Sequence, residues 1–301
     1  MSAATPLLRV EGLTRDFVTR KDLFGRATAK LRAVNDVSFE IAPGETLGLV
    51  GESGSGKSTT GRLVLRLDEP TEGRIFFEGQ EITGLRGGGL APVRRKLQVV
   101  FQDPYSSLNP RMRVGESVGE PLSVHGVVGS AAERRDAVAE LFRRVGLDPR
   151  FMDRFPHQFS GGQRQRIGIA RAVALSPKLI VADEPITALD VSIQAQIINL
   201  FLDLQEQMGM AYLFIAHDLG MVRYLCHRVA VMLRGRIVEM GPTDQVFAHP
   251  QHRYTQALLS AAPIPDPDRE LQRRRLPYEP VPPPPEAQLA EVAPGHWVLA
   301  A

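Results

Sequence analysis

The sequence contains a single cysteine, Cys226, among 301 residues. One thiol excludes a disulfide within the chain and any metal site made of several cysteines. The stretch around it, Met221–Cys226, is mostly apolar. We therefore expect Cys226 to be a small buried side chain.

Long hydrophobic runs are also absent. No window approaches the ~18 consecutive apolar residues that a membrane-spanning helix needs. The first residues, Met1–Pro6, lack the charged and apolar regions of a signal peptide. These absences favour a protein that remains in the cytoplasm. With 43% hydrophobic and 23% charged residues, the chain can form one large domain with an appendage.

A strong charge of either sign is the third absence. The net charge is +2, and nucleic-acid binding would need a clustered basic face. Two basic clusters are visible, and we expect both to be solvated loop or helix surface, although either could face an acidic partner or lipid headgroups. They are Arg94-Arg95-Lys96 and the set Arg20, Lys21, Arg26, Lys30 and Arg32.

A glycine-rich stretch follows the apolar run Thr46–Val50 and reads Gly51-Glu52-Ser53-Gly54-Ser55-Gly56-Lys57-Ser58-Thr59. Helical spacing follows it, so the order predicts strand, glycine loop and helix. Such a loop turns its backbone N–H groups toward phosphate oxygens, and the helix N-terminus adds partial positive charge. Lys57 is placed for the β- and γ-phosphates, and the Ser58 hydroxyl can hold Mg²⁺.

The rest of the chain alternates strands and helices, and the pattern predicts an α/β fold. Strands are expected at 7–17, 33–42, 73–79, 97–101, 179–182, 211–216, 229–233 and 236–240, and helices at 114–124, 131–145, 163–175 and 192–208 and from 219. The first strands suggest an antiparallel β-subdomain, and the helices between 113 and 175 suggest an inserted helical one. From Pro263 onward proline recurs, so we expect an extended or disordered tail.

Polar side chains follow two of the apolar strands. Asp183 and Glu184 end the run 179–182, where Asp183 can reach a Mg²⁺ shell and Glu184 can polarise an attacking water. His217 follows the strand 211–216, and its imidazole could donate to a terminal phosphate. Ser160-Gly161-Gly162-Gln163 opens a second helix that can bind an anion, although an ordinary helix cap explains this motif equally well on its own.

In this order the motifs resemble those of the ATP-binding subunit of ABC transporters, over about residues 7 to 262. The matching motifs are Walker A at Gly51–Thr59, the Q-loop glutamine Gln102, the signature Ser160–Gln163, Walker B at Leu179–Asp183, the catalytic glutamate Glu184, the D-loop Ala188-Leu189-Asp190 and the switch histidine His217. Phe17 occupies the place of the aromatic residue that stacks on adenine.

The closer resemblance is to the ATPases of peptide and nickel importers, particularly the oligopeptide and dipeptide type. Residues 100–112, 188–196 and 249–259 are similar to that subfamily's Q-loop, D-loop and carboxyl-terminal motif, with Arg253 where proline is usual. Many members carry a cysteine-rich segment that binds an iron–sulfur cluster. This tail has no cysteine, so we expect no cluster.

The resemblance implies a P-loop NTPase core of mostly parallel sheet over residues 1–262, with a helical subdomain at about 103–175 and a tail at 263–301. It implies ATP and Mg²⁺ as cofactors. It assigns catalysis to Glu184, His217 and Gln102, and Mg²⁺ binding to Ser58, Gln102 and Asp183. Phe17, the Walker A residues, the signature and Asp190 would contact the nucleotide.

The resemblance also implies a head-to-tail dimer, in which Walker A of one cassette faces the signature of another, either a paralogue or a second copy. Further partners would be two transmembrane permease subunits and, indirectly, an extracytoplasmic solute-binding protein, with the cassette peripheral on the cytoplasmic face of the inner membrane. The solute would be an oligopeptide or a dipeptide, with nickel and glutathione as alternatives.

Two other classes are less favoured. A soluble ABC ATPase acting on nucleic acid would favour two cassettes in one chain or a long coiled-coil insertion. A P-loop kinase would not need Ser160–Gln163 or the D-loop run.

Overall fold

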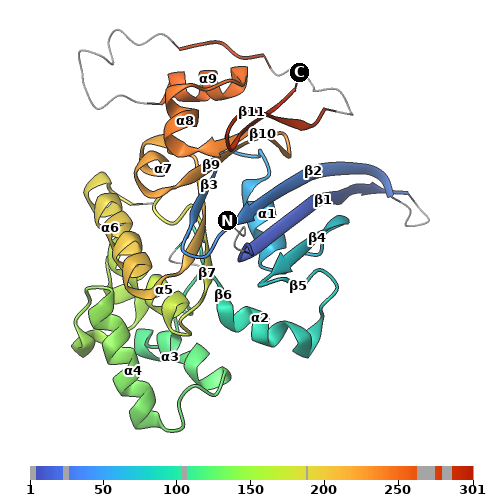
Figure 1. Cartoon of the computed structure of the whole chain (residues 1–301). Helices are drawn as coiled ribbons and strands as arrows, with labels where there is room; N and C mark the ends of the chain where they lie inside the picture. Colours follow the sequence, from blue (N-terminus) through green and yellow to red (C-terminus); the bar gives the residue numbers. More distant parts are fainter. Residues whose placement is uncertain are drawn as a thin grey trace. The chain divides into compact units, whose positions relative to one another are not determined.

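The computed structural model describes residues 5–22, 27–103, 107–187, 189–262, 275–279 and 287–300. The chain divides into two compact units, which we call unit 1 (Met1–Gly84 with Leu213–Ala301) and unit 2 (Leu85–Tyr212). Figure 1 colours the elements along the chain.

Unit 1 contains an antiparallel sheet with the strand order β2-β1-β4-β5. Its strands are β1 (Leu8–Lys21), β2 (Ala27–Ile41), β4 (Glu72–Phe77) and β5 (Gln80–Glu81). Apolar side chains alternate along β1 and β2, and pairs such as Leu8 with Ile41 and Val10 with Phe39 are buried. This alternation gives the sheet one apolar face. The predicted N-terminal antiparallel β-subdomain is confirmed.

The basic segment after residue 20 differs from the expectation of a loop. β1 and β2 stay paired beyond the end of β4 and form a two-stranded ribbon, in which Asp16 pairs with Arg32 and Arg20 with Ala29. Lys30 and Arg32 are therefore strand residues. The described residues on either side of 23–26 pair because the two strands lie close in sequence and an ion pair joins them. Arg26 lies outside the described residues.

A second sheet contributes strands to unit 1 in the order β11-β12-β10-β9-β3. β3 runs parallel to β9, and the other neighbours are antiparallel. All the residues of β3 are buried, as its apolar run predicts. The strands are β3 (Thr46–Val50), β9 (Arg228–Leu233), β10 (Arg236–Pro242), β11 (Leu289–Ala293) and β12 (His296–Leu299).

The helices of unit 1 are α1 (Lys57–Val64), α7 (Leu219–Leu225), α8 (Thr243–Ala248) and α9 (Arg253–Ala261). Cys226 follows α7 and is buried, as expected. A Cβ placed on Gly48 of β3 would lie 2.9 Å from Cys226 Sγ and 2.9 Å from Val222 Cγ1 of α7. Because glycine has no side chain there, α7 can pack closely on the strand.

The end of the chain corrects the expectation of an extended or disordered tail. β11 and β12 form a hairpin, and β12 adds to β10 with Glu239 opposite Val298. The proline-rich residues 263–274 and 280–286 lie outside the described residues, so the expectation stays a prediction for them.

Unit 2 combines a parallel strand pair with helices. β6 (Leu97–Val100) pairs with β7 (Leu179–Asp183), and the chain between them forms α3 (Val114–Val124), α4 (Ala131–Arg144) and α5 (Gly161–Val173). α3 contacts both α4 and α5. The other helices are α2 (Ala91–Lys96) and α6 (Val191–Met208), with 3-10 turns η1 (Gly87–Leu90), η2 (Pro149–Phe151) and η3 (Pro156–Gln158). The predicted α/β class with inserted helices is confirmed.

The boundary between the units falls inside β8 (Ala211–Ala216), whose residues are all buried. The sequence predicted the same bounds for this strand.

Candidate functional site

The glycine loop lies between β3 and α1, as the sequence predicts. Gly51, Gly54 and Gly56 all have positive φ angles, of 149°, 80° and 106°. A Cβ on Gly51 would lie 2.2 Å from the Met232 carbonyl oxygen, and one on Gly56 would lie 2.4 Å from that of Ala33. Only glycine fits at 51 and 56, because the backbone of β9 and β2 packs directly on the loop there.

Two side chains give the loop its polarity. Lys57 is 4% exposed, and its Nζ donates hydrogen bonds to the carbonyl oxygens of Gly51 at 2.7 Å and Glu52 at 2.8 Å. The Ser55 hydroxyl is buried and has no hydrogen-bond partner among the described residues. Burying a polar group without a partner is costly, so an unsatisfied hydroxyl marks a place for a ligand.

The start of α1 has the character of an anion site. Ser58 and Thr59 lie in its first turn, which contains no acidic residue. A Cβ on Gly54 would meet nothing within 4 Å, so the loop is open on that side. A lysine ammonium, an unsatisfied hydroxyl and a helix N-terminus with no acidic residue in its first turn fit the phosphates of a nucleotide.

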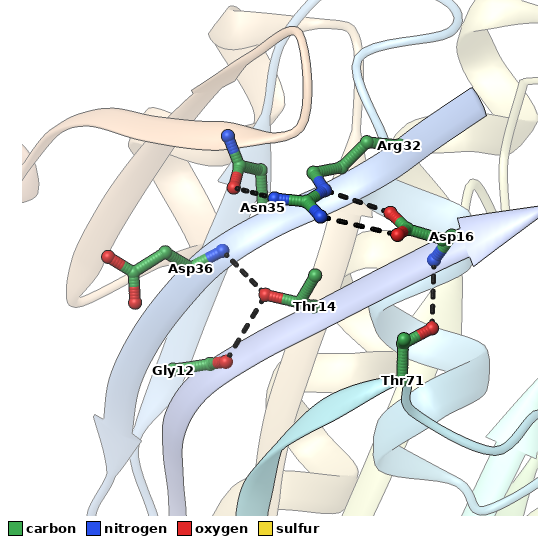
Figure 2. Close-up of polar contacts among 7 residues, drawn as sticks. All are labelled: Gly12, Thr14, Asp16, Arg32, Asn35, Asp36 and Thr71. Atoms are coloured by element: carbon green, nitrogen blue, oxygen red, sulfur yellow. Dashed lines mark hydrogen bonds and ion pairs between the residues drawn. The ribbon is translucent and has the colours of Figure 1, made fainter. Parts of the chain in front are cut away.

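Phe17, the predicted adenine-stacking residue, lies at the base of the ribbon and is half-buried, opposite Leu31. The Arg15 guanidinium lies 4.7 Å from the centre of its ring. The preceding residue is held tightly. Figure 2 shows the Arg32 guanidinium facing the Asp16 carboxylate, with Nε and Nη2 donating to its two oxygens at 2.8 and 3.2 Å.

Asp16 is also held by Thr71, the residue before β4, because the Asp16 N–H donates to the Thr71 hydroxyl at 3.0 Å. The hydrogen bond from Arg32 lowers the pKa of Asp16, so this carboxylate stays charged at neutral pH. The backbone next to Phe17 is therefore fixed. Arg32, one of the residues of the basic segment, forms its ion pair within the ribbon.

Walker B ends as predicted, with Asp183 closing β7 and Glu184 directly after it. Glu184 Oε2 accepts hydrogen bonds from Gln102 Nε2 at 3.1 Å and from the Thr187 hydroxyl at 3.2 Å. Its φ of 46° is in the left-handed region, which is unfavourable for a residue with a side chain. The structure thus brings two of the predicted catalytic side chains into contact.

The signature motif begins α5. Ser160 Oγ accepts the Gln163 N–H at 3.3 Å, and Gln163 Oε1 accepts the Ser160 N–H at 3.0 Å. This reciprocal arrangement is a capping box. The first turn of α5 has no acidic residue, so the capped helix start keeps its affinity for anions.

The two glycines of the signature pack against the D-loop region. A Cβ on Gly161 would lie 3.4 Å from Leu189 Cδ2, and one on Gly162 would lie 2.5 Å from Ile193 Cγ2. Asp190 is the N-cap residue of α6, and Ala188 lies outside the described residues. The signature and the D-loop are therefore one packed cluster.

His217 lies directly after β8 and is exposed. Asp218 caps α7, with its Oδ1 accepting the Gly220 N–H at 2.8 Å. The position agrees with the prediction that the imidazole ends a core strand.

Several residues that support the site were missed at the sequence level. The Tyr254 hydroxyl contacts the Glu52 N–H, the Gly235 N–H donates to the Ser55 carbonyl, and Thr187 holds Glu184. Gln194 donates to the carbonyls of Ile186 and Leu189 and so braces the D-loop. Only Tyr254 and Gln194 lie in motifs that the sequence had singled out.

The predicted Mg²⁺ ligands Ser58, Gln102 and Asp183 offer a hydroxyl, an amide and a carboxylate oxygen, which suit this hard cation. Among the described residues, no cluster of three or more His, Cys, Asp or Glu side chains could hold a metal ion. The described helices include none that is both long enough and apolar enough to cross a membrane.

Comparisons with known proteins agree with this geometry. The family described as "ABC transporter" matches residues 34–187, and "Oligopeptide/dipeptide transporter, C-terminal region" matches residues 238–287. The "Glutathione import ATP-binding protein GsiA" of Salmonella paratyphi A is 55% identical over 97% of this chain and 48% of its own length. The Escherichia coli K12 protein of the same name is 53% identical with the same coverage. The chain thus spans about half the length of these curated relatives.

Solved structures are similar as well. The ATP-binding cassette MJ0796, in a dimeric post-hydrolysis state bound to ADP and Pi, has a TM-score of 0.70 and 31% identity, covering 78% of this chain and 98% of MJ0796. CbiO1 from Clostridium perfringens, part of an ABC transporter complex, has a TM-score of 0.69 and 28% identity, covering 81% and 91%. This chain therefore belongs to the ABC transporter family as an ATP-binding cassette, and it carries the C-terminal region of the oligopeptide and dipeptide transporters.

Proposed function

We propose that the chain is the ATP-hydrolysing subunit of an importer for glutathione or other short peptides. The observation that carries this proposal is the combination of a complete cassette with the oligopeptide-type C-terminal region, in a chain 55% identical to a glutathione import ATP-binding protein. The sequence had favoured oligopeptides or dipeptides, with nickel and glutathione as alternatives. Glutathione is itself a tripeptide, so the two descriptions are close.

In this proposal each residue of the site has a defined task. Lys57 and the N–H groups of the loop bind the phosphates, and Phe17 stacks on the base. Ser58, Gln102 and Asp183 would hold Mg²⁺, which neutralises phosphate charge and orients the nucleotide when bound. Glu184 takes the proton of the attacking water, and Gln102 and Thr187 orient its carboxylate. His217 donates a hydrogen bond to the terminal phosphate.

The working unit in this proposal is a dimer of cassettes. Ser160–Gln163 and Asp190 would meet the ATP held by the Walker A loop of a second cassette, either a copy or a paralogue. The capping box supports this role, because it fixes a helix N-terminus whose first turn contains no acidic residue. The dimeric form of MJ0796 supports it further. Closure around ATP would move two transmembrane permease subunits, with the cassettes on the cytoplasmic face and a binding protein delivering solute outside.

The test is transport by the assembled complex. The chain is purified with its co-expressed membrane subunits and binding protein, reconstituted into vesicles with ATP on the cassette side, and offered labelled glutathione, dipeptides, longer peptides or Ni²⁺. We expect ATP-dependent uptake of glutathione or short peptides and none of Ni²⁺. Uptake of Ni²⁺ alone, or ATPase activity that responds to nucleic acid instead of membrane subunits, would contradict the proposal.

A further inference from the structure

Tyr254 on α9 reaches the phosphate loop although it is about two hundred residues away in sequence. Its side chain is 1% exposed, and its Oη accepts a hydrogen bond from the Glu52 N–H at 3.0 Å. That N–H belongs to the peptide group between Gly51 and Glu52. The carbonyl of the same group, from Gly51, accepts from Lys57 Nζ at 2.7 Å.

This peptide group is therefore held from two sides. In a trans peptide the N–H and the C=O point in opposite directions, so Tyr254 and Lys57 approach it from opposite edges. When a nucleotide binds, its phosphate oxygens compete with the loop carbonyls for the N–H donors of Lys57. The contact from Tyr254 does not compete with phosphate and can persist, which keeps the start of the loop in position.

Tyr254 is itself held by a cluster around the buried Glu239 carboxylate, which we call the Glu239 cluster (Glu239, Gln251, His252 and His296). Glu239 on β10 is fully buried, and its carboxylate accepts the N–H groups of Gln251 at 2.8 Å and His252 at 2.9 Å. His296 Nε2 of β12 lies 2.7 Å from Glu239 Oε1. His252 Nδ1 accepts the Tyr254 N–H at 3.1 Å and so caps α9.

We propose that Tyr254 is a positioning residue for ATP, through which the C-terminal region orients the first peptide group of the phosphate loop. The Glu239 cluster fixes the start of α9, and Tyr278 packs on the Tyr254 ring with 5.3 Å between centroids. A loop held in its binding geometry before ATP arrives binds more tightly, because less ordering remains to be done. Burial raises the pKa of Tyr254 to about 12, so the hydroxyl stays neutral at physiological pH. The inference rests on the proposed binding of ATP.

The test replaces Tyr254 by phenylalanine, which keeps the ring and removes only Oη. Tyr212→Phe is the matched control, because Tyr212 is also buried and its Oη donates to the Phe201 carbonyl at 3.0 Å within unit 2. We expect Tyr254→Phe to raise the Kd for MgATP about three- to tenfold, the value of one hydrogen bond. The KM for ATP should rise similarly, with kcat at saturating ATP within about twofold of wild type. Tyr212→Phe should leave both constants unchanged.

A second measurement separates positioning from general destabilisation. Hydrogen–deuterium exchange of the peptide that contains Gly51–Ser55 should be faster in Tyr254→Phe and unchanged in Tyr212→Phe, at temperatures where both variants remain folded. The inference would be overturned if Tyr254→Phe changed neither the ATP affinity nor the exchange rate, or if Tyr212→Phe lost as much affinity as Tyr254→Phe. Either result would leave the proposed function standing. A wild-type chain that binds no ATP would contradict the proposed function as well.

Discussion

Replacement of Glu184 by glutamine tests the catalytic assignment most directly. The change removes the negative charge and one oxygen, and it keeps the length of the side chain. Gln102 Nε2 and the Thr187 hydroxyl both donate to a single oxygen, Oε2, at 3.1 and 3.2 Å. A glutamine at 184 retains one oxygen that can accept both bonds. We therefore expect the fold, the side-chain position and ATP binding to survive.

The expected decrease in the rate of ATP hydrolysis follows from the loss of the general base. A positioned general base contributes roughly 10²–10⁴-fold to a rate, which corresponds to about 3–5 kcal/mol of activation free energy. Glu184→Ala would in addition remove the acceptor for Gln102 and Thr187. These two bonds are solvent-exposed, so their loss should cost about 1 kcal/mol or less each. In both variants the loss of the general base should therefore cost more activation free energy than the loss of the hydrogen bonds that position residue 184.

The assay is phosphate release by the assembled transporter at saturating ATP, with retained nucleotide measured in parallel. We expect Glu184→Gln to hydrolyse ATP at least about a hundredfold more slowly and to retain ATP in a closed dimer. Thr187→Val is the control, because it removes one contact to Glu184 and leaves the carboxylate. It should slow hydrolysis by less than about tenfold. Hydrolysis near the wild-type rate by Glu184→Gln would refute the role of Glu184 as the base.

Three further sets of substitutions test the local geometry. Gly56→Ala should lower the free energy of unfolding, measured with denaturant, by about 2 kcal/mol or more, because its Cβ would lie 2.4 Å from a carbonyl oxygen. Gly54→Ala should lower it by only about 1 kcal/mol, because a Cβ there meets nothing within 4 Å. Ser160→Ala should lose about 1 kcal/mol of stability with its cap, and Ser160→Asp should keep the cap yet prevent ATP-dependent dimerisation in size-exclusion chromatography. Burial lowers the pKa of His252, so as the pH falls this side chain is protonated in the unfolded chain before it is protonated in the folded one. The free energy of unfolding should therefore decrease as the pH drops below about 6.5. In His252→Asn, whose amide oxygen can still cap α9, the difference in melting temperature between pH 7.5 and 5.5 should be smaller.

The phosphate loop and the helix starts were predictable because their signals are local. A strand, three glycines and a lysine within about ten residues specify the loop, and Ser160 with Gln163 three residues later specifies a capping box. The strand Ala211–Ala216 and the helix Val114–Val124 have the predicted bounds for the same reason. Each depends on an apolar pattern and its neighbours along the chain.

The ribbon after residue 16 was predicted wrongly because its determinants lie across two strands. Residues 20–32 are polar and contain glycine, and this composition favours a loop. The part of this segment that the structure describes as strand, up to Lys21 and from Ala27, depends on the register between β1 and β2, which includes the ion pair between Asp16 and Arg32, sixteen residues apart. The contact between Gln102 and Glu184 was invisible for a similar reason. Each residue was identified by its own motif, and eighty-two positions separate them.

The carboxyl-terminal region shows why composition misleads. Proline dominates residues 263–285, yet His296 lies beyond them and contacts a carboxylate on β10. Glu239 sits between Val238 and Met240 in the buried part of β10, where a charge is tolerated only if donors surround it. Those donors come from the turn before α9 and from β12, so these three segments of unit 1 stabilise one another. Tyr254 lies two residues after His252, in the first turn of α9, and its hydroxyl accepts the Glu52 N–H, so the region is part of the structure that holds the phosphate loop.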